Sequence, residues 1–232
     1  MKDFVRSDMP SKKIIASLED LRRSYNLRYT LDPIEAPEEH YRWVLEKLRP
    51  IPGKTLLDVA CGKGRFLKIS QEQGLKVYGI DISEIALAQA RDYFRTPSLA
   101  LASGESLPFR DNFFDYITNL GSLEHFLSPE NGVQEMARII KPEGIVGILL
   151  PNLYPLFEIL HVLKTGYGRP RNQDLERFES LNDWQDLLEE NGLKVLKIYG
   201  DNGCSKKLKH VLLKPFIPLR LAHHFLFICQ KK

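Results

Sequence analysis

Short apolar runs alternate with segments of helical periodicity along most of the chain. Each apolar run predicts a buried strand, and apolar residues spaced three and four apart predict helices that cover the sheet. Strands are predicted near Leu56 and Leu57 and at 75–81, 99–102, 111–119, 144–150, 193–199 and 222–229. Helices are predicted for one or two turns between Ile14 and Tyr29, after Pro37, after Gly64, from Ser83, at 129–140 and at 181–191.

The pattern divides the chain into one α/β domain and an extension. At 232 residues, one domain at 51–232 with a helical extension at 1–50 fits better than two domains. Tyr25 and Tyr29 in the extension are interpreted either as core packing or as part of a lid over a ligand. Within the domain, an apolar and aromatic insertion at 151–180 is interpreted as the wall of an acceptor pocket or as a helical cover for the sheet.

Composition narrows the class of protein. The hydrophobic fraction of 43% is enough for a buried core, and the net charge of +3 argues only weakly against nucleic-acid binding. The three cysteines have no metal-ligand spacing, so we expect no metal site and no disulfide framework. Without an apolar leader or a membrane span in the sequence, a cytoplasmic location is expected.

A strand, a tight turn and a helix follow one another between Thr55 and Leu67. Gly62 and Gly64 allow backbone angles closed to other residues and let a ligand lie against the main chain. A dinucleotide fingerprint requires a third glycine, but Leu67 stands there, and the carboxylate of Asp58 would repel a pyrophosphate. A ligand with an ammonium and a sulfonium group would instead gain from that carboxylate. A turn that binds nothing is the alternative.

An acidic residue ends the next predicted strand. Asp81 follows the first acid at the distance typical of carboxylates that bind a ribose diol in nucleotide-binding βαβ units. Ile82 could cover one face of an adenine ring, and Ser83 can cap the next helix. The alternative for Asp81 is a purely structural role at the start of that helix.

These motifs, taken in order, resemble the class I S-adenosylmethionine-dependent methyltransferases of the ubiquinone/menaquinone-biosynthesis type. The resemblance covers residues 55–152 and includes the acid–glycine turn, Asp81, the Glu105-x-Leu-Pro-Phe block, the Leu123-Glu-His125 segment and Lys141-Pro-Glu-Gly144. It implies S-adenosylmethionine as the cofactor and S-adenosylhomocysteine as the product. It also implies a doubly wound, mostly parallel sheet of seven strands with the last strand antiparallel.

The resemblance also implies further cofactor-binding residues. Ala60 stands where the family usually has glycine, and Ser103 stands where it has an adenine-binding aspartate. A serine hydroxyl can accept the same hydrogen bond, although a charged acceptor binds more strongly. The cofactor-binding residues implied in this way, together with those named above, are Asp58, Ala60, Gly62, Gly64, Asp81, Ile82, Ser103, Gly104, Glu105, Asn119 and Leu120.

His125 follows the fourth strand, on the side of an open α/β sheet where ligands bind. It is the predicted catalytic residue, acting as a base or as a ligand of the acceptor; packing is the alternative. The expected acceptor is a small, partly apolar or lipid-like molecule. Segment 204–220 is rich in lysine and large apolar residues and has no acid, so contact with an anionic membrane is one interpretation and a solvated basic face the other.

Two rival functions remain open at this stage. A nicotinamide-dependent oxidoreductase is disfavoured by Leu67 and Asp58. A cofactor-binding scaffold without transfer activity is compatible with the departures at Ala60 and Ser103. Methylation of nucleic acid is disfavoured because Asn119-Leu-Gly-Ser replaces the Asn/Asp-Pro-Pro-Tyr/Phe tetrapeptide after the fourth strand. The sequence fixes neither the acceptor, nor the atom methylated, nor the oligomeric state.

Overall fold

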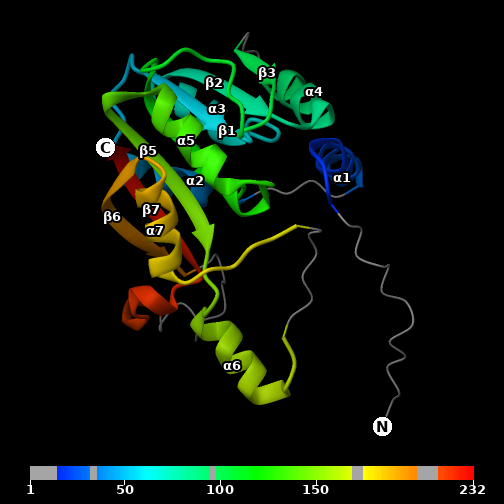
Figure 1. Cartoon of the computed structure of the whole chain (residues 1–232), viewed down its shortest axis with the longest axis vertical. Helices are drawn as coiled ribbons and strands as arrows, with labels where there is room; N and C mark the ends of the chain where they lie inside the picture. The colour runs from blue at the N-terminus through cyan, green and yellow to red at the C-terminus, as the bar shows by residue number, and fades with distance from the viewer. Residues whose placement is uncertain (1–14, 32–35, 95–97, 169–174, 203–213) are drawn as a thin grey trace.

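A seven-stranded sheet with helices on both faces forms the body of the protein (Figure 1). The computed structural model describes residues 15–31, 36–94, 98–168, 175–202 and 214–232. The strands lie in the order β3-β2-β1-β4-β5-β7-β6. Their bounds are β1 (Thr55–Val59), β2 (Lys76–Asp81), β3 (Leu99–Leu101), β4 (Phe114–Leu120), β5 (Ile140–Pro151), β6 (Leu193–Asp201) and β7 (His224–Lys231).

The direction of the strands confirms the predicted topology. Strands β1 to β5 pair in parallel, and β7 is antiparallel to both of its neighbours, β5 and β6. The middle strands β1 and β4 are buried along almost their whole length, as expected for parallel strands covered on both faces. The carboxyl ends of six strands and the start of β7 therefore meet at one edge of the sheet.

Helices cover the two faces with separate apolar clusters. On one face, α2 (Glu38–Leu48), α3 (Arg65–Glu72) and α4 (Glu84–Tyr93) contribute buried residues such as Leu48, Phe66 and Leu87. On the other face, α5 (Pro129–Ile139) and α7 (Leu181–Glu190) contribute Met136 and Trp184. The fold is therefore doubly wound, as predicted.

Helix boundaries follow local capping. Ser83 accepts a hydrogen bond from the Ala86 amide at the start of α4, and Ser180 forms a reciprocal capping box with Asp183 at the start of α7. Several boundaries differ from prediction, two of them clearly. Helix α1 (Leu18–Leu31) is 14 residues long, more than the one or two turns expected. Strand β5 begins at Ile140 rather than at 144. Its pairing with β4 shifts register between Phe114, which pairs with Ile140, and Tyr116, which pairs with Ile145, so the additional residues of β5 form an irregularity in the strand.

Helix α6 (Leu156–Thr165) forms the core of the predicted insertion and projects away from the sheet at the lower end of Figure 1. None of its ten residues is buried. Leu163 on this helix and Tyr167 beyond it are each 77% exposed. The alternative of a helix that covers the sheet is therefore wrong for α6. Most of the basic segment 204–220 lies outside the described residues, so the membrane contact stays a prediction.

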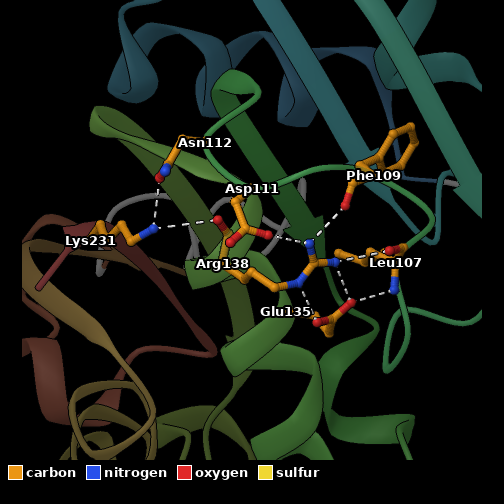
Figure 2. Close-up of polar contacts among 7 residues, drawn as sticks. All are labelled: Leu107, Phe109, Asp111, Asn112, Glu135, Arg138 and Lys231. Carbon is orange, nitrogen blue, oxygen red and sulfur yellow. Dashed lines mark hydrogen bonds and ion pairs between the residues drawn. The ribbon is translucent and has the colours of Figure 1, made fainter.

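Arg138 of α5 fixes the loop that contains the Leu-Pro-Phe block, as Figure 2 shows. Its guanidinium donates to the carbonyl oxygens of Leu107 (3.0 Å) and Phe109 (2.7 Å) and to the carboxylates of Asp111 and Glu135. Glu135 also accepts a hydrogen bond of 2.6 Å from the Leu107 amide. The network ties the loop after β3 to α5, and this loop begins with the predicted adenine contacts at 103–105.

Replacing Arg138 with methionine is expected to destabilise the protein by about 2 kcal/mol, because several charge-assisted hydrogen bonds are lost while the aliphatic stem is kept. Urea unfolding measures the change. Arg91→Met, at an exposed position on α4, is the control and should change stability by less than about 0.5 kcal/mol. Equal effects of the two substitutions would show that the network contributes nothing.

Candidate active site

A cavity of about 920 Å³ runs along the carboxyl edge of the sheet. Its size is near the upper end of the range for small-molecule sites, so it has room for a cofactor and an acceptor together. Residues from the ends of β1, β2, β5 and β6, from the start of β7, from the turn after β4 and from helices α1 and α2 line it. This is the edge at which open α/β sheets bind ligands.

The turn after β1 contributes Gly62 to the cavity wall, whereas Gly64 does not line the cavity. Gly62 and Gly64 have φ angles of 54° and 72°, in the left-handed region. A Cβ atom on Gly62 would lie 2.6 Å from the hydroxyl oxygen of Tyr29, so only glycine allows α1 to approach the main chain here. Tyr29 thus lies over the predicted cofactor turn. Its position fits the lid interpretation, which stays a prediction.

Ala60 has a φ angle of 62°, also in the left-handed region. This conformation costs a residue with a Cβ atom about 1–2 kcal/mol. Ala60→Gly is therefore expected to stabilise the protein by about 1 kcal/mol, measured by thermal or urea unfolding. In the control Ala88→Gly, at an exposed position inside α4, the same substitution should destabilise by about 1 kcal/mol. Destabilisation by both would contradict the strain at Ala60.

Two buried carboxyl groups lie at the cofactor end of the cavity. Asp58 accepts a hydrogen bond of 2.7 Å from Thr118, and Asp81 accepts one of 2.8 Å from each of the Gly62 and Ser83 amides. Burial raises the pKa of Asp58 to about 7 against the effect of Thr118, and the Asp81 carboxylate raises it further. Burial likewise raises the pKa of Asp81 to about 6, although its backbone hydrogen bonds lower it. A cationic ligand would favour the ionised form of both groups.

The predicted adenine contacts lie on the same wall. Ile82, Ser103, Gly104 and Glu105 all line the cavity. A Cβ atom on Gly104 would collide with the Phe126 ring, which explains glycine there. Both carboxylate oxygens of Glu105 accept hydrogen bonds from backbone amides at the start of α5. Its side chain therefore supports the wall, and a direct contact with the cofactor stays a prediction.

Asn119 and Leu120 differ in their positions. Leu120 lines the cavity, whereas the Asn119 side chain is fully buried between two backbone groups. Its amide donates to the Val59 carbonyl (3.2 Å), and its oxygen accepts from the Leu123 amide (2.9 Å). These bonds hold the turn after β4 against β1. The structure gives Asn119 a positioning role, and its predicted contact with the cofactor stays untested.

His125 and Glu124 form a buried pair on the acceptor side of the cavity, in a short helical turn, η2 (Leu123–His125). Nδ1 of His125 must donate to the Leu175 carbonyl oxygen, since that oxygen can only accept. Nε2 of the neutral ring then carries the free lone pair and lies 3.7 Å from Oε1 of Glu124. Within the part of the chain that the structure describes, Nε2 of His125 and Oε2 of Glu124 are buried and have no hydrogen-bond partner.

Burial sets the charge state of this pair. It raises the pKa of Glu124 to about 8 and lowers the pKa of His125 to about 4, although the Leu175 carbonyl favours the protonated ring. Near neutral pH the carboxyl group is therefore protonated and the imidazole is neutral. Unsatisfied buried polar atoms are costly, and their presence on a cavity wall is typical of a binding or catalytic site.

The sequence interpretation missed several residues that line or build the site. Glu124 is next to the predicted His125, and this adjacency was the available signal. Arg177, from the segment after the insertion, donates to the carbonyl oxygens of Glu124 and Leu127 and holds the turn in place. The site also includes four residues at its far end, whose only signal was a His-His pair at the start of the last strand: His40, Asp201, His223 and His224.

The insertion contributes less to the cavity than its composition predicts. Among the large apolar residues of the insertion, Leu153 lines the cavity, whereas the cavity wall does not include Tyr154, Leu156, Phe157, Ile159 and Leu160. Helix α6 instead faces the cavity with Pro155, Glu158 and Val162, which are spaced at helical intervals. The cavity does extend from Gly62 past His125 to α6, so the insertion forms one wall of it.

The site fits S-adenosylmethionine by its chemistry. Gly62 and the buried acids Asp58 and Asp81 all line the cavity, and the carboxyl group of Asp81 stands at the tip of β2, where it can accept a hydrogen bond from a ribose hydroxyl. When bound, the cofactor would supply an electrophilic methyl group. The fold and the site are those expected of an S-adenosylmethionine-dependent methyltransferase.

Comparison with known proteins agrees. Residues 57–148 match the family described as "Methyltransferase domain". Proteins named ubiquinone/menaquinone biosynthesis C-methyltransferase UbiE, from Burkholderia mallei and Burkholderia thailandensis, are 27% identical to the chain over 229 residues, covering 87% of it and 92% of the relative. The chain is therefore an S-adenosylmethionine-dependent methyltransferase with a domain similar to that of these enzymes.

Solved structures share the fold. A TehB-like S-adenosylmethionine-dependent methyltransferase from Corynebacterium glutamicum matches 93% of the chain and 98% of its own length with a TM-score of 0.58 and 18% identity. The [4+2]-cyclase SpnF matches 93% and 97% with a TM-score of 0.68 and 17% identity. Within the described residues, no helix has the length and apolar character needed to span a membrane.

Proposed function

We propose that the protein methylates a small, partly apolar acceptor with a hydroxylated aromatic ring. The observation that carries this proposal is a pair of buried polar atoms without a hydrogen-bond partner among the described residues, Nε2 of His125 and Oε2 of Glu124, which belong to two residues that line the cavity. A ring hydroxyl is both a proton source and a hydrogen-bond donor. It would satisfy either atom and would become a nucleophile on losing its proton.

Apolar groups on the same wall support the rest of the acceptor. Leu153 and Val162 line the cavity beside the turn, and Tyr25 of α1 lies edge-on to the His125 ring with 6.2 Å between ring centroids. The names of the relatives from Burkholderia refer to quinone biosynthesis, and a reduced quinone ring belongs to the proposed acceptor class. In-line methyl transfer depends mainly on holding donor and acceptor in a closed site, so few catalytic side chains are needed.

The test is a transfer assay with isotopically labelled S-adenosylmethionine. The probe is a naphthohydroquinone with a short alkyl chain, kept reduced by dithionite, and the control probe is its dimethyl ether. We expect label in the hydroquinone product by mass spectrometry and none in the ether, because the ether has no proton to remove. Fragmentation shows whether carbon or oxygen is methylated. Cofactor binding without labelling of the hydroquinone would contradict the proposed acceptor class.

A further inference from the structure

Four polar side chains from three separate elements gather at the end of the cavity farthest along the sheet from the cofactor turn. Nδ1 of His40, on α2, lies 3.6 Å from Oδ2 of Asp201, which ends β6. Nδ1 of His224, the first residue of β7, lies 3.8 Å from the same oxygen, and Nδ1 of His223 lies 2.8 Å from Nδ1 of His224. All four residues line the cavity. We call them the histidine–aspartate cluster.

The strand order separates this cluster from the cofactor residues. Asp58 and Asp81 end β1 and β2, whereas the cluster belongs to β6 and β7, on the other side of β4 and β5. The Glu124–His125 pair follows β4 and lies between them along the edge. A molecule that fills the cavity beyond this pair therefore reaches the cluster, and that molecule is the acceptor rather than the cofactor.

The rings of His40 and His224 lie close to Asp201 without bonding it directly. Distances of 3.6 and 3.8 Å are too long for direct hydrogen bonds between the rings and the carboxylate. A hydroxyl group that approaches from the cavity, beside this line of atoms, can donate to the carboxylate and accept from a ring N–H. Within the described residues, no three His, Cys, Asp or Glu side chains are arranged to hold a metal ion.

The charge of the cluster selects the chemistry of its ligand. Burial lowers the pKa of His40. Burial, with a smaller contribution from the neighbouring His223 ring, lowers the pKa of His224 to about 4. The Asp201 carboxylate raises the pKa of both rings but does not outweigh burial. The rings of His40 and His224 are therefore neutral near pH 7, beside a carboxylate. An anionic group would be repelled there, whereas a hydrogen-bond donor would be bound.

We propose that the histidine–aspartate cluster is a second recognition site for the acceptor and binds a hydroxyl group remote from the methylated position. This inference rests on the proposed function, because it takes the occupant of the cavity to be a hydroxylated acceptor. Asp201 accepts the hydrogen bond from this hydroxyl, and the neutral rings of His40 and His224 orient it. The cluster would then select acceptors with polar groups at both ends of an otherwise apolar molecule.

The test compares two probes in the full-length protein with S-adenosylhomocysteine bound. One is the naphthohydroquinone with a short alkyl chain, and the other is the naphthol that lacks the second hydroxyl. Asp201→Asn keeps the shape and removes the charge, and His161→Gln on α6, which does not line the cavity, is the control. Calorimetry should show that Asp201→Asn weakens hydroquinone binding about 10-fold or more and leaves naphthol binding within about 2-fold.

Equal weakening for both probes, or no weakening for either, would overturn the proposal, and so would a wild-type protein that binds neither probe. Because the readout is binding, its result is separate from the transfer assay. Selective weakening by Asp201→Asn without any methyl transfer would support the cluster and count against the proposed reaction. The variant should keep the wild-type affinity for S-adenosylhomocysteine, which shows that the cofactor end of the site is intact.

Discussion

His125→Ala is expected to lower the rate of methyl transfer by about 100-fold or more, the usual contribution of a positioned general base. Its affinity for S-adenosylmethionine should stay at the wild-type value. The physical reason is that Nε2 carries the free lone pair on the acceptor side of the cavity, while the cofactor groups belong to β1 and β2. Single-turnover rates and calorimetric titrations measure the two quantities separately. Equal loss of both would show that His125 supports the cofactor pocket or the fold.

The pH dependence gives the same prediction a second readout. Below about pH 8, the Glu124 carboxyl group is protonated and cannot stabilise an imidazolium ring; above it, the carboxylate can. The transfer rate of the wild-type protein should therefore rise as pH increases through about 8. Glu124→Gln, which cannot ionise, should remove this rise. A rise of the same size in Glu124→Gln would assign it to another group.

Asp81→Ala is expected to weaken binding of S-adenosylmethionine by about 1–3 kcal/mol, because a charged hydrogen-bond acceptor is removed from the tip of β2. The carboxylate also accepts the Gly62 and Ser83 amides, so the substitution should loosen the turn after β1 as well. Asp81→Asn serves as the matched variant that keeps the shape. Unfolding curves check that both variants fold, and calorimetry measures affinity. Wild-type affinity in Asp81→Ala would contradict the ribose-binding assignment.

Local sequence order explains why several predicted cofactor residues, among them Asp58, Gly62 and Asp81, line one cavity, while their contact with the cofactor stays a prediction. The glycines at 62 and 64 and the acids at 58 and 81 act through strand ends and a tight turn, and short-range spacing determines both. The left-handed angle of Ala60 also explains why the family usually has glycine at this position. Topology followed from the ordered motifs rather than from periodicity, which cannot assign strand direction.

The acceptor half depends on contacts between distant segments. His125 meets the carbonyl of Leu175, and Asp201 meets His40 across most of the chain. No local pattern encodes such pairs. The orientation of α6 could not be predicted from the sequence either, because an apolar helix normally packs against a core. In the structure this helix projects from the sheet and exposes residues such as Leu163.

Proton-linked binding of the cofactor tests the central claim most directly. Calorimetric titration with S-adenosylmethionine near pH 6.5, in buffers of different ionisation enthalpy, measures affinity and the protons exchanged. The cation-bearing ligand should favour the ionised forms of Asp58 and Asp81, whose pKa values are about 7 and about 6, so binding should release protons and tighten as pH rises from about 5 to about 8. No binding, or binding with proton uptake, would contradict the assignment of this cavity to S-adenosylmethionine.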